Sequence, residues 1–96
     1  MEAYVYILYS SKLNRYYIGS TELAPEQRLE LHLSKNYGYS KYTAKADDWI
    51  VYESSICNNI STARKVERYI KRMKSRKFIE SLKDNQGKWN WIIERI

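Results

Sequence analysis

The sequence predicts a small α/β (α+β) domain, and three patterns support that class. Two segments near the start are rich in valine, isoleucine and tyrosine, and a short polar connector joins them. A third segment of this kind lies near the middle of the chain, and segments with helical spacing of apolar residues separate and follow the strands. With 96 residues and 44% hydrophobic residues, the chain is expected to form one domain, residues 1–96, with a modest core.

The first two strands are expected at residues 4–9, YVYILY, and 15–20, RYYIGS, paired as an antiparallel hairpin. Because side chains alternate along a strand, Tyr17 and Gly19 should point to one face. Glycine there would let backbone or substrate come close. The tyrosines have two explanations. They are good strand and core residues, or the hydroxyls of Tyr6 and Tyr17 enter one cleft and orient or deprotonate a water for attack on phosphorus.

A first helix is expected from about residue 24 to 34, because Pro25 suits a first helical turn and leucines recur one turn apart. Arg28 and His32 are also one turn apart, on a stripe beside the leucines. Arg28 could hold a phosphate oxygen with two hydrogen bonds, or pair with a neighbouring glutamate. His32, the only histidine, could move protons near neutral pH, or simply fill a surface or core position.

The next segment, residues 36–48, is polar and contains glycine, which predicts a loop. Residues 49–54, WIVYES, are expected to form the third strand, with a turn at the following NN. The single cysteine, Cys57, excludes an internal disulfide and is expected to be a buried, unreactive thiol, which places the chain in the reducing cytoplasm. No apolar run approaches the roughly 20 residues that span a bilayer, so no membrane association is expected.

A long helix is expected over residues 61–74, STARKVERYIKRMK, capped by Ser61 or Thr62. Glu67 is the only acid from residue 61 to 77. It could form an i,i+4 salt bridge with Lys71, worth about 0.3 kcal/mol. It could instead be a metal ligand, because Mg²⁺ often binds one or two carboxylates and takes its other ligands from water and substrate phosphate. The expected core stripe of this helix is Ala63, Val66, Ile70 and Met73.

The charge of the chain is uneven. Residues 1–48 hold six basic and six acidic residues, whereas residues 49–96 hold eleven basic and five acidic residues, so the net charge of +6 lies in the second half. A basic surface of this kind indicates a polyanion such as nucleic acid, or else a solvated helix face. The residues expected to bind nucleic acid are Lys41, Arg64, Arg68, Lys71 and Lys74.

The remaining residues are expected to form one more helix and a tail. RKFIESLKD should be helical after a break at Ser75, and NQG should be a turn. Residues 84–96 are expected to form a tail. Its Trp89 and Trp91 could stack on bases, or pack in the core or against a partner.

Five segments in order resemble the GIY-YIG endonuclease superfamily, as a small single-domain member similar to the N-terminal nuclease domain of the bacterial excision-repair nuclease subunit. Tyr4 stands where the family often has glycine, and the resemblance covers about residues 3–83. The segments are YVY at 4–6, YIG at 17–19, RLELH at 28–32, YSKYTAKADDWIVYES at 39–54 and ARKVERYIKRMKSRKFIESL at 63–82.

The resemblance implies a three-stranded antiparallel sheet flanked by helices, and hydrolysis of phosphodiester bonds that depends on a divalent metal. By matching positions, Tyr6 and Tyr17 would orient and activate the attacking water. Arg28 would steady the phosphate, and His32 would assist proton transfer or substrate positioning. Glu67 would bind one Mg²⁺ or Mn²⁺ ion.

The function expected from the resemblance is therefore an endonuclease acting on DNA, such as branched or damaged DNA, in a setting such as DNA repair. Targeting would come from its own basic face or from a partner protein. The alternative is a nucleic-acid-binding module that keeps the fold without activity. A plain interaction domain would leave both the basic half and the paired tyrosines unexplained.

Overall fold

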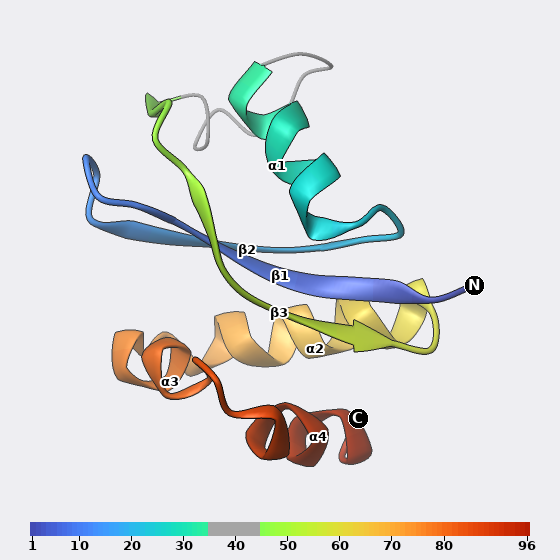
Figure 1. Ribbon diagram of the computed structural model, residues 1–96. Helices are drawn as coiled ribbons and strands as arrows, with labels where there is room; N and C mark the ends of the chain where they lie inside the picture. The colour runs from blue at the N-terminus through green and yellow to red at the C-terminus, as the bar shows by residue number, and fades with distance from the viewer. Residues whose placement is uncertain (35–44) are drawn as a thin grey trace.

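The computed structural model describes residues 1–34 and 45–96. The three strands form one antiparallel sheet in the order β2-β1-β3, so β2 lies at an edge. Helix α1 (Pro25–Ser34) covers one face, and α2, α3 and α4 lie on the other (Figure 1). The expected three-stranded sheet with flanking helices is confirmed. The strands are β1 (Ala3–Ser10), β2 (Arg15–Thr21) and β3 (Ile50–Cys57). Strand β3 extends three residues beyond the end of the predicted segment.

The face under α1 has a small core of its own. Tyr6 and Leu8 of β1 are buried there with Trp49, which precedes β3. Leu29 and Leu33 of α1 pack against them, as their i,i+4 spacing predicts. This packing holds α1 over the hairpin and so fixes where the other side chains of the helix lie.

The opposite face carries the larger core, which includes Val5 and Ile7 of β1 and Ile18 of β2. Helix α2 (Ile60–Met73) packs its buried residues against this face. Two expectations for α2 are corrected. Its N-cap is Asn59, whose side chain accepts a hydrogen bond from the Thr62 amide, because asparagine caps at least as well as serine or threonine. Met73 is 43% exposed, because the helix ends there. The buried residues of α2 are Ala63, Val66 and Ile70.

The last part of the chain also differs from the expectation. Helix α3 (Arg76–Ser81) begins after the predicted break, where Ser75 caps it. Residues 86–94, expected as part of a turn and a tail, form helix α4 (Gln86–Glu94) with Asn85 as its N-cap. Asn85, expected to begin a turn, is instead the N-cap of this helix. The helix is too short to be stable by itself, and burial of Trp89 and Ile92 in the larger core stabilises it.

Cys57 is free and buried, as expected, and burial raises the pKa of its thiol. Burial and the raised pKa both disfavour the reactive thiolate. No helix among residues 1–34 and 45–96 is long and apolar enough to cross a membrane.

Candidate active site

The site begins at Gly19 on the edge strand. Gly19 pairs with Tyr6 of the central strand, and a Cβ added to Gly19 would lie 2.4 Å from the Tyr6 hydroxyl oxygen. The tyrosine ring therefore extends over β2 in space that a side chain would occupy. The sequence suggested that glycine would admit backbone or substrate, and the structure shows that it admits the Tyr6 ring.

The Tyr6 hydroxyl gathers the expected residues of α1 around it. It lies 3.0 Å from Nε2 of His32, and Nε of Arg28 donates a long hydrogen bond of 3.4 Å to it. The Tyr17 ring stands edge-on to the His32 ring, with centroids 5.1 Å apart. The structure thus brings together Tyr6, Tyr17, Arg28 and His32, which we call the tyrosine–arginine cluster.

The side chains of Tyr6 and His32, at the centre of this cluster, are both neutral near pH 7. Burial is the main cause that raises the pKa of Tyr6 to about 12, with Tyr17 and Glu67 acting in the same direction and Arg28 opposing them. Burial, and then the positive charge of Arg28, lowers the pKa of His32 to about 4. Because the Arg28 guanidinium can only donate, the Tyr6 oxygen accepts from it, and the Tyr6 proton can be donated to Nε2 of a His32 tautomer protonated at Nδ1.

Burial separates the two tyrosines. Tyr6 is 1% exposed, so its hydroxyl does not open to solvent directly, whereas Tyr17 is only partly buried. The geometry therefore gives Tyr6 contact with Arg28 and His32 rather than with bulk water. Tyr17 is therefore the more exposed tyrosine of the cluster.

Glu67 reaches the same strand from the opposite face. It lies on α2, and its Oε1 accepts a 2.6 Å hydrogen bond from the Ser20 hydroxyl. Its Oε2 forms an ion pair with Nζ of Lys71 at 2.6 Å. This is the i,i+4 salt bridge that the sequence analysis gave as one of two possible roles for Glu67. The Glu67 side chain is 18% exposed, so a small ligand can still approach the carboxylate.

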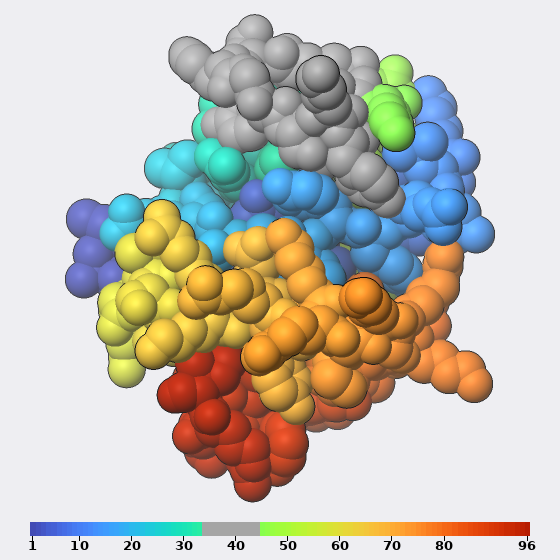
Figure 2. Space-filling model, turned by 180° about the vertical axis from the view of Figure 1, so that it is seen from behind, coloured from blue at the N-terminus to red at the C-terminus, as the bar shows by residue number. Residues whose placement is uncertain are grey.

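Glu67 and the tyrosine–arginine cluster meet at two consecutive residues, because Gly19 supports Tyr6 and Ser20 holds Glu67. A shallow pocket of about 270 Å³ beside Glu67 is lined by Ser20, Arg64 and Arg68. In the described part of the chain, the pocket beside Glu67 includes no residue of the tyrosine–arginine cluster. The two sides still interact, since the charge of Glu67 helps to raise the pKa of Tyr6. Figure 2 shows this side of the molecule, where β2 is exposed between α1 and α2.

The residues expected to bind nucleic acid fall into three groups. Arg64 and Arg68 line the pocket beside Glu67. Lys71 is paired with Glu67, and Lys74 lies one turn further along at the end of α2. Lys41 lies outside the described residues.

The metal expectation can be tested against the chemistry of Glu67. Among residues 1–34 and 45–96, no group of three or more histidine, cysteine or acidic side chains could hold a metal ion. A single accessible carboxylate fits an ion such as Mg²⁺, which keeps several waters and takes further oxygens from substrate phosphate. The residues present therefore fit the expected ion only if the substrate completes its shell.

Ser20 is the site residue that the sequence analysis missed. Alternation along β2 places it on the same face as Ile18, the face that α2 covers. That alternation was the only available signal. Pairing with Glu67, 47 residues later, depends on how α2 packs.

A model of the GIY-YIG catalytic domain matches residues 2–80 of the 96-residue chain. The chain belongs to the GIY-YIG family. Members of this family are generally nucleases, so the GIY-YIG domain indicates a nuclease-type function and a nucleic-acid substrate. The match includes every residue of the tyrosine–arginine cluster together with Ser20 and Glu67, and it ends before α4. Comparisons with curated proteins and with solved structures gave no match.

Acid should lower the free energy of unfolding of this GIY-YIG domain, because His32 takes up a proton more readily in the unfolded chain. Its folded pKa of about 4 lies below the ordinary value of 6.5, so the unfolded chain takes up this proton first. The free energy of unfolding should therefore fall as pH drops from 6.5 towards 4. Urea unfolding at pH 7 and pH 5 measures the change. A His32→Gln variant should lose less stability over this interval, and an equal loss would show that His32 is not the group responsible.

Proposed function

We propose that the protein is an endonuclease that hydrolyses phosphodiester bonds in DNA, using one Mg²⁺ or Mn²⁺ ion held by Glu67. The observation that carries this proposal is the meeting of the tyrosine–arginine cluster and Glu67 at Gly19 and Ser20 of the exposed edge strand. A scissile phosphate placed over these two residues would have a guanidinium on one side and a carboxylate on the other.

The exposure and charge of each side chain in the tyrosine–arginine cluster suggest its role in hydrolysis. Tyr17 orients the attacking water. Arg28 steadies the phosphate and the negative charge that grows on it, and the buried Tyr6 hydroxyl positions this guanidinium. His32, neutral above pH 4, can accept a proton relayed through Tyr6. Water adds to phosphorus and the bond to the 3′ oxygen breaks, which leaves a 5′-phosphate and a 3′-hydroxyl.

Glu67 is the residue that would hold the ion, oriented by the Ser20 hydroxyl. When bound, the divalent ion polarises the phosphate and stabilises the charge of the leaving oxygen. Lys71 occupies Oε2 in the structure and therefore competes with the ion. A substrate phosphate can draw the Lys71 ammonium away from Oε2, which would link ion binding to substrate binding.

The Lys71→Ala variant should bind Mn²⁺ more tightly without DNA. Half of the Lys71 side chain is exposed, and such ion pairs contribute about 1 kcal/mol or less, so the gain should reach at most about fivefold. Isothermal titration with Mn²⁺ measures it. Lys74→Ala, which removes a charge one turn away, is the control and should leave the Mn²⁺ affinity unchanged. Equal affinities for both variants and the wild type would contradict the competition.

Nicking of supercoiled plasmid tests the activity itself. The wild-type protein should nick the plasmid with Mg²⁺ or Mn²⁺ and stop when EDTA is added, and the products should be substrates for a DNA ligase. An inert protein that still binds DNA with a steep salt dependence would favour a catalytically silent binding module instead. Branched and damaged duplexes, assayed beside linear DNA, would show a structural preference. A cytoplasmic role in DNA repair, with or without a targeting protein, remains part of this proposal.

A further inference from the structure

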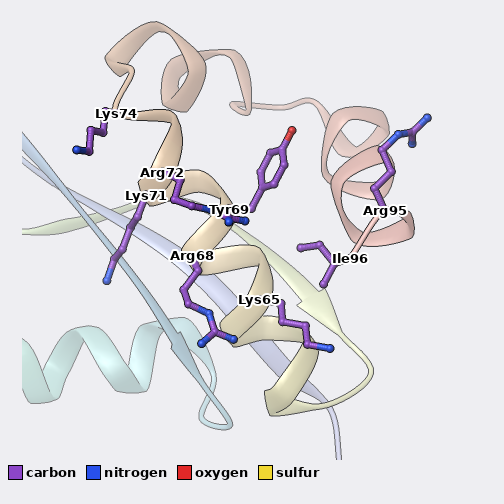
Figure 3. Close-up of a pocket in the computed structure, with 8 residues that line it drawn as sticks. All are labelled: Lys65, Arg68, Tyr69, Lys71, Arg72, Lys74, Arg95 and Ile96. Carbon is purple, nitrogen blue, oxygen red and sulfur yellow. The ribbon is translucent and has the colours of Figure 1, made fainter.

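A second basic surface lies on the side of α2 that faces the end of α4. It is a groove with a volume of about 750 Å³. Its lining within the described part of the chain includes no acidic side chain. We call it the α2–α4 groove; its residues are Lys65, Arg68, Tyr69, Lys71, Arg72, Lys74, Arg95 and Ile96 (Figure 3).

Helical spacing on α2 builds one wall of the groove. Lys65, Tyr69 and Arg72 follow each other at intervals of one turn. Arg95, just after α4, stands on the opposite side, and its guanidinium stacks on the exposed Trp91 at 3.8 Å. Figure 3 shows the Tyr69 ring projecting from α2 on the side where Arg95 and Ile96 lie. Cations beside an aromatic ring suit a phosphate backbone and the bases or sugars attached to it.

The groove is continuous with the candidate active site. Arg68 lines both the α2–α4 groove and the small pocket beside Glu67. Lys71 lines the groove and pairs with Glu67. A polyanion held in the groove would therefore extend to the edge of β2. This continuity favours a nucleic-acid strand over an acidic protein or a lipid surface. A nucleic-acid strand bound in the groove would present its next phosphates to the proposed site at Glu67, whereas the other two partners would gain nothing from contact with that site.

We propose that the α2–α4 groove binds the sugar–phosphate backbone of the nucleic acid beside the scissile bond and supplies most of the affinity for it. The position of the scissile bond rests on the proposed function. The groove uses Arg95 and Ile96, which follow α4 and lie outside the match to the family's catalytic domain. The groove would give this chain a substrate-binding surface that is separate from the groups that perform hydrolysis.

The test measures DNA binding where cleavage cannot occur. In a Glu67→Gln background with EDTA, anisotropy of a labelled duplex gives affinity and its dependence on salt. The groove variant combines Lys65→Gln, Arg72→Gln and Arg95→Gln, whose side chains form no hydrogen bond or ion pair with Glu67 in the described part of the chain. We expect its affinity to fall at least about tenfold and the slope of log K against log salt to fall by about 2 to 3. The matched control replaces three exposed cations outside the groove, Lys12, Lys77 and Lys83.

Equal affinity and slope for the groove variant and the control would overturn the proposal. So would a loss of binding to phosphatidylserine-containing vesicles with DNA binding unchanged, which would assign the groove to a lipid surface. If the triple variant unfolds on heating much earlier than the control, single Lys65→Gln and Arg72→Gln variants decide, each with an expected slope change of about 1. Because binding is read without cleavage, an inactive wild-type protein would refute the proposed function and leave this result intact.

Discussion

Replacing Glu67 with glutamine should reduce plasmid nicking by about 100-fold or more. The amide keeps the shape of the side chain and can still accept the Ser20 hydrogen bond, but it loses the negative charge that a divalent ion requires. Folding should change little, because the ion pair with Lys71 is partly exposed. Single-turnover nicking in a titration of Mg²⁺ measures the effect, and a high concentration of the ion should restore part of the activity.

Glu30→Gln is the matched control for this experiment. Glu30 is an exposed residue of α1, and its replacement removes the same charge. The control should nick at the wild-type rate. If the Glu67→Gln variant nicks as fast as the control, the ion is held elsewhere and the proposed mechanism fails. Wild-type activity that persists in EDTA would exclude a required ion altogether.

Gly19→Ala should lower both stability and activity. The added Cβ would lie 2.4 Å from the Tyr6 hydroxyl oxygen and 2.5 Å from Cζ of the ring. Tyr6 is fully buried and its hydroxyl is bonded to His32 and Arg28, so the ring has little freedom to move away. Overpacking of this kind costs about 1–3 kcal/mol. Because a displaced Tyr6 no longer holds the guanidinium, nicking should fall further than the loss of folded protein explains.

Gly87→Ala provides the control for the added methyl group. Gly87 lies in α4, and a Cβ there meets only Asn85 Oδ1 at 3.7 Å, an ordinary contact. Alanine is favoured over glycine inside a helix, so this variant should be stabilised by about 0.5–1 kcal/mol. Thermal unfolding and nicking of both variants give the comparison. A Gly19→Ala protein as stable and active as the wild type would show that the close contact with Tyr6 is unimportant.

The sequence predicted the hairpin and α1 well because their signals are local. Alternation along the strands placed Tyr17 and Gly19 on one face, and Pro25 with two leucines one turn apart marked the helix. The end of the chain was predicted poorly for the opposite reason. Only contact with the larger core, through Trp89, shows that residues 86–94 form a helix rather than a tail.

By itself, the sequence determined which chemical groups this GIY-YIG domain has: two tyrosines, an arginine and histidine one turn apart, and one acid among cations. The tertiary structure decided how those groups meet. It buried Tyr6 over Gly19, and it brought Glu67 to Ser20 across the edge of β2. It also set the end of α4 beside the basic side of α2. Side-chain periodicity acts over a few residues, whereas these contacts depend on how helices pack on the two faces of a sheet, which no short stretch of sequence specifies.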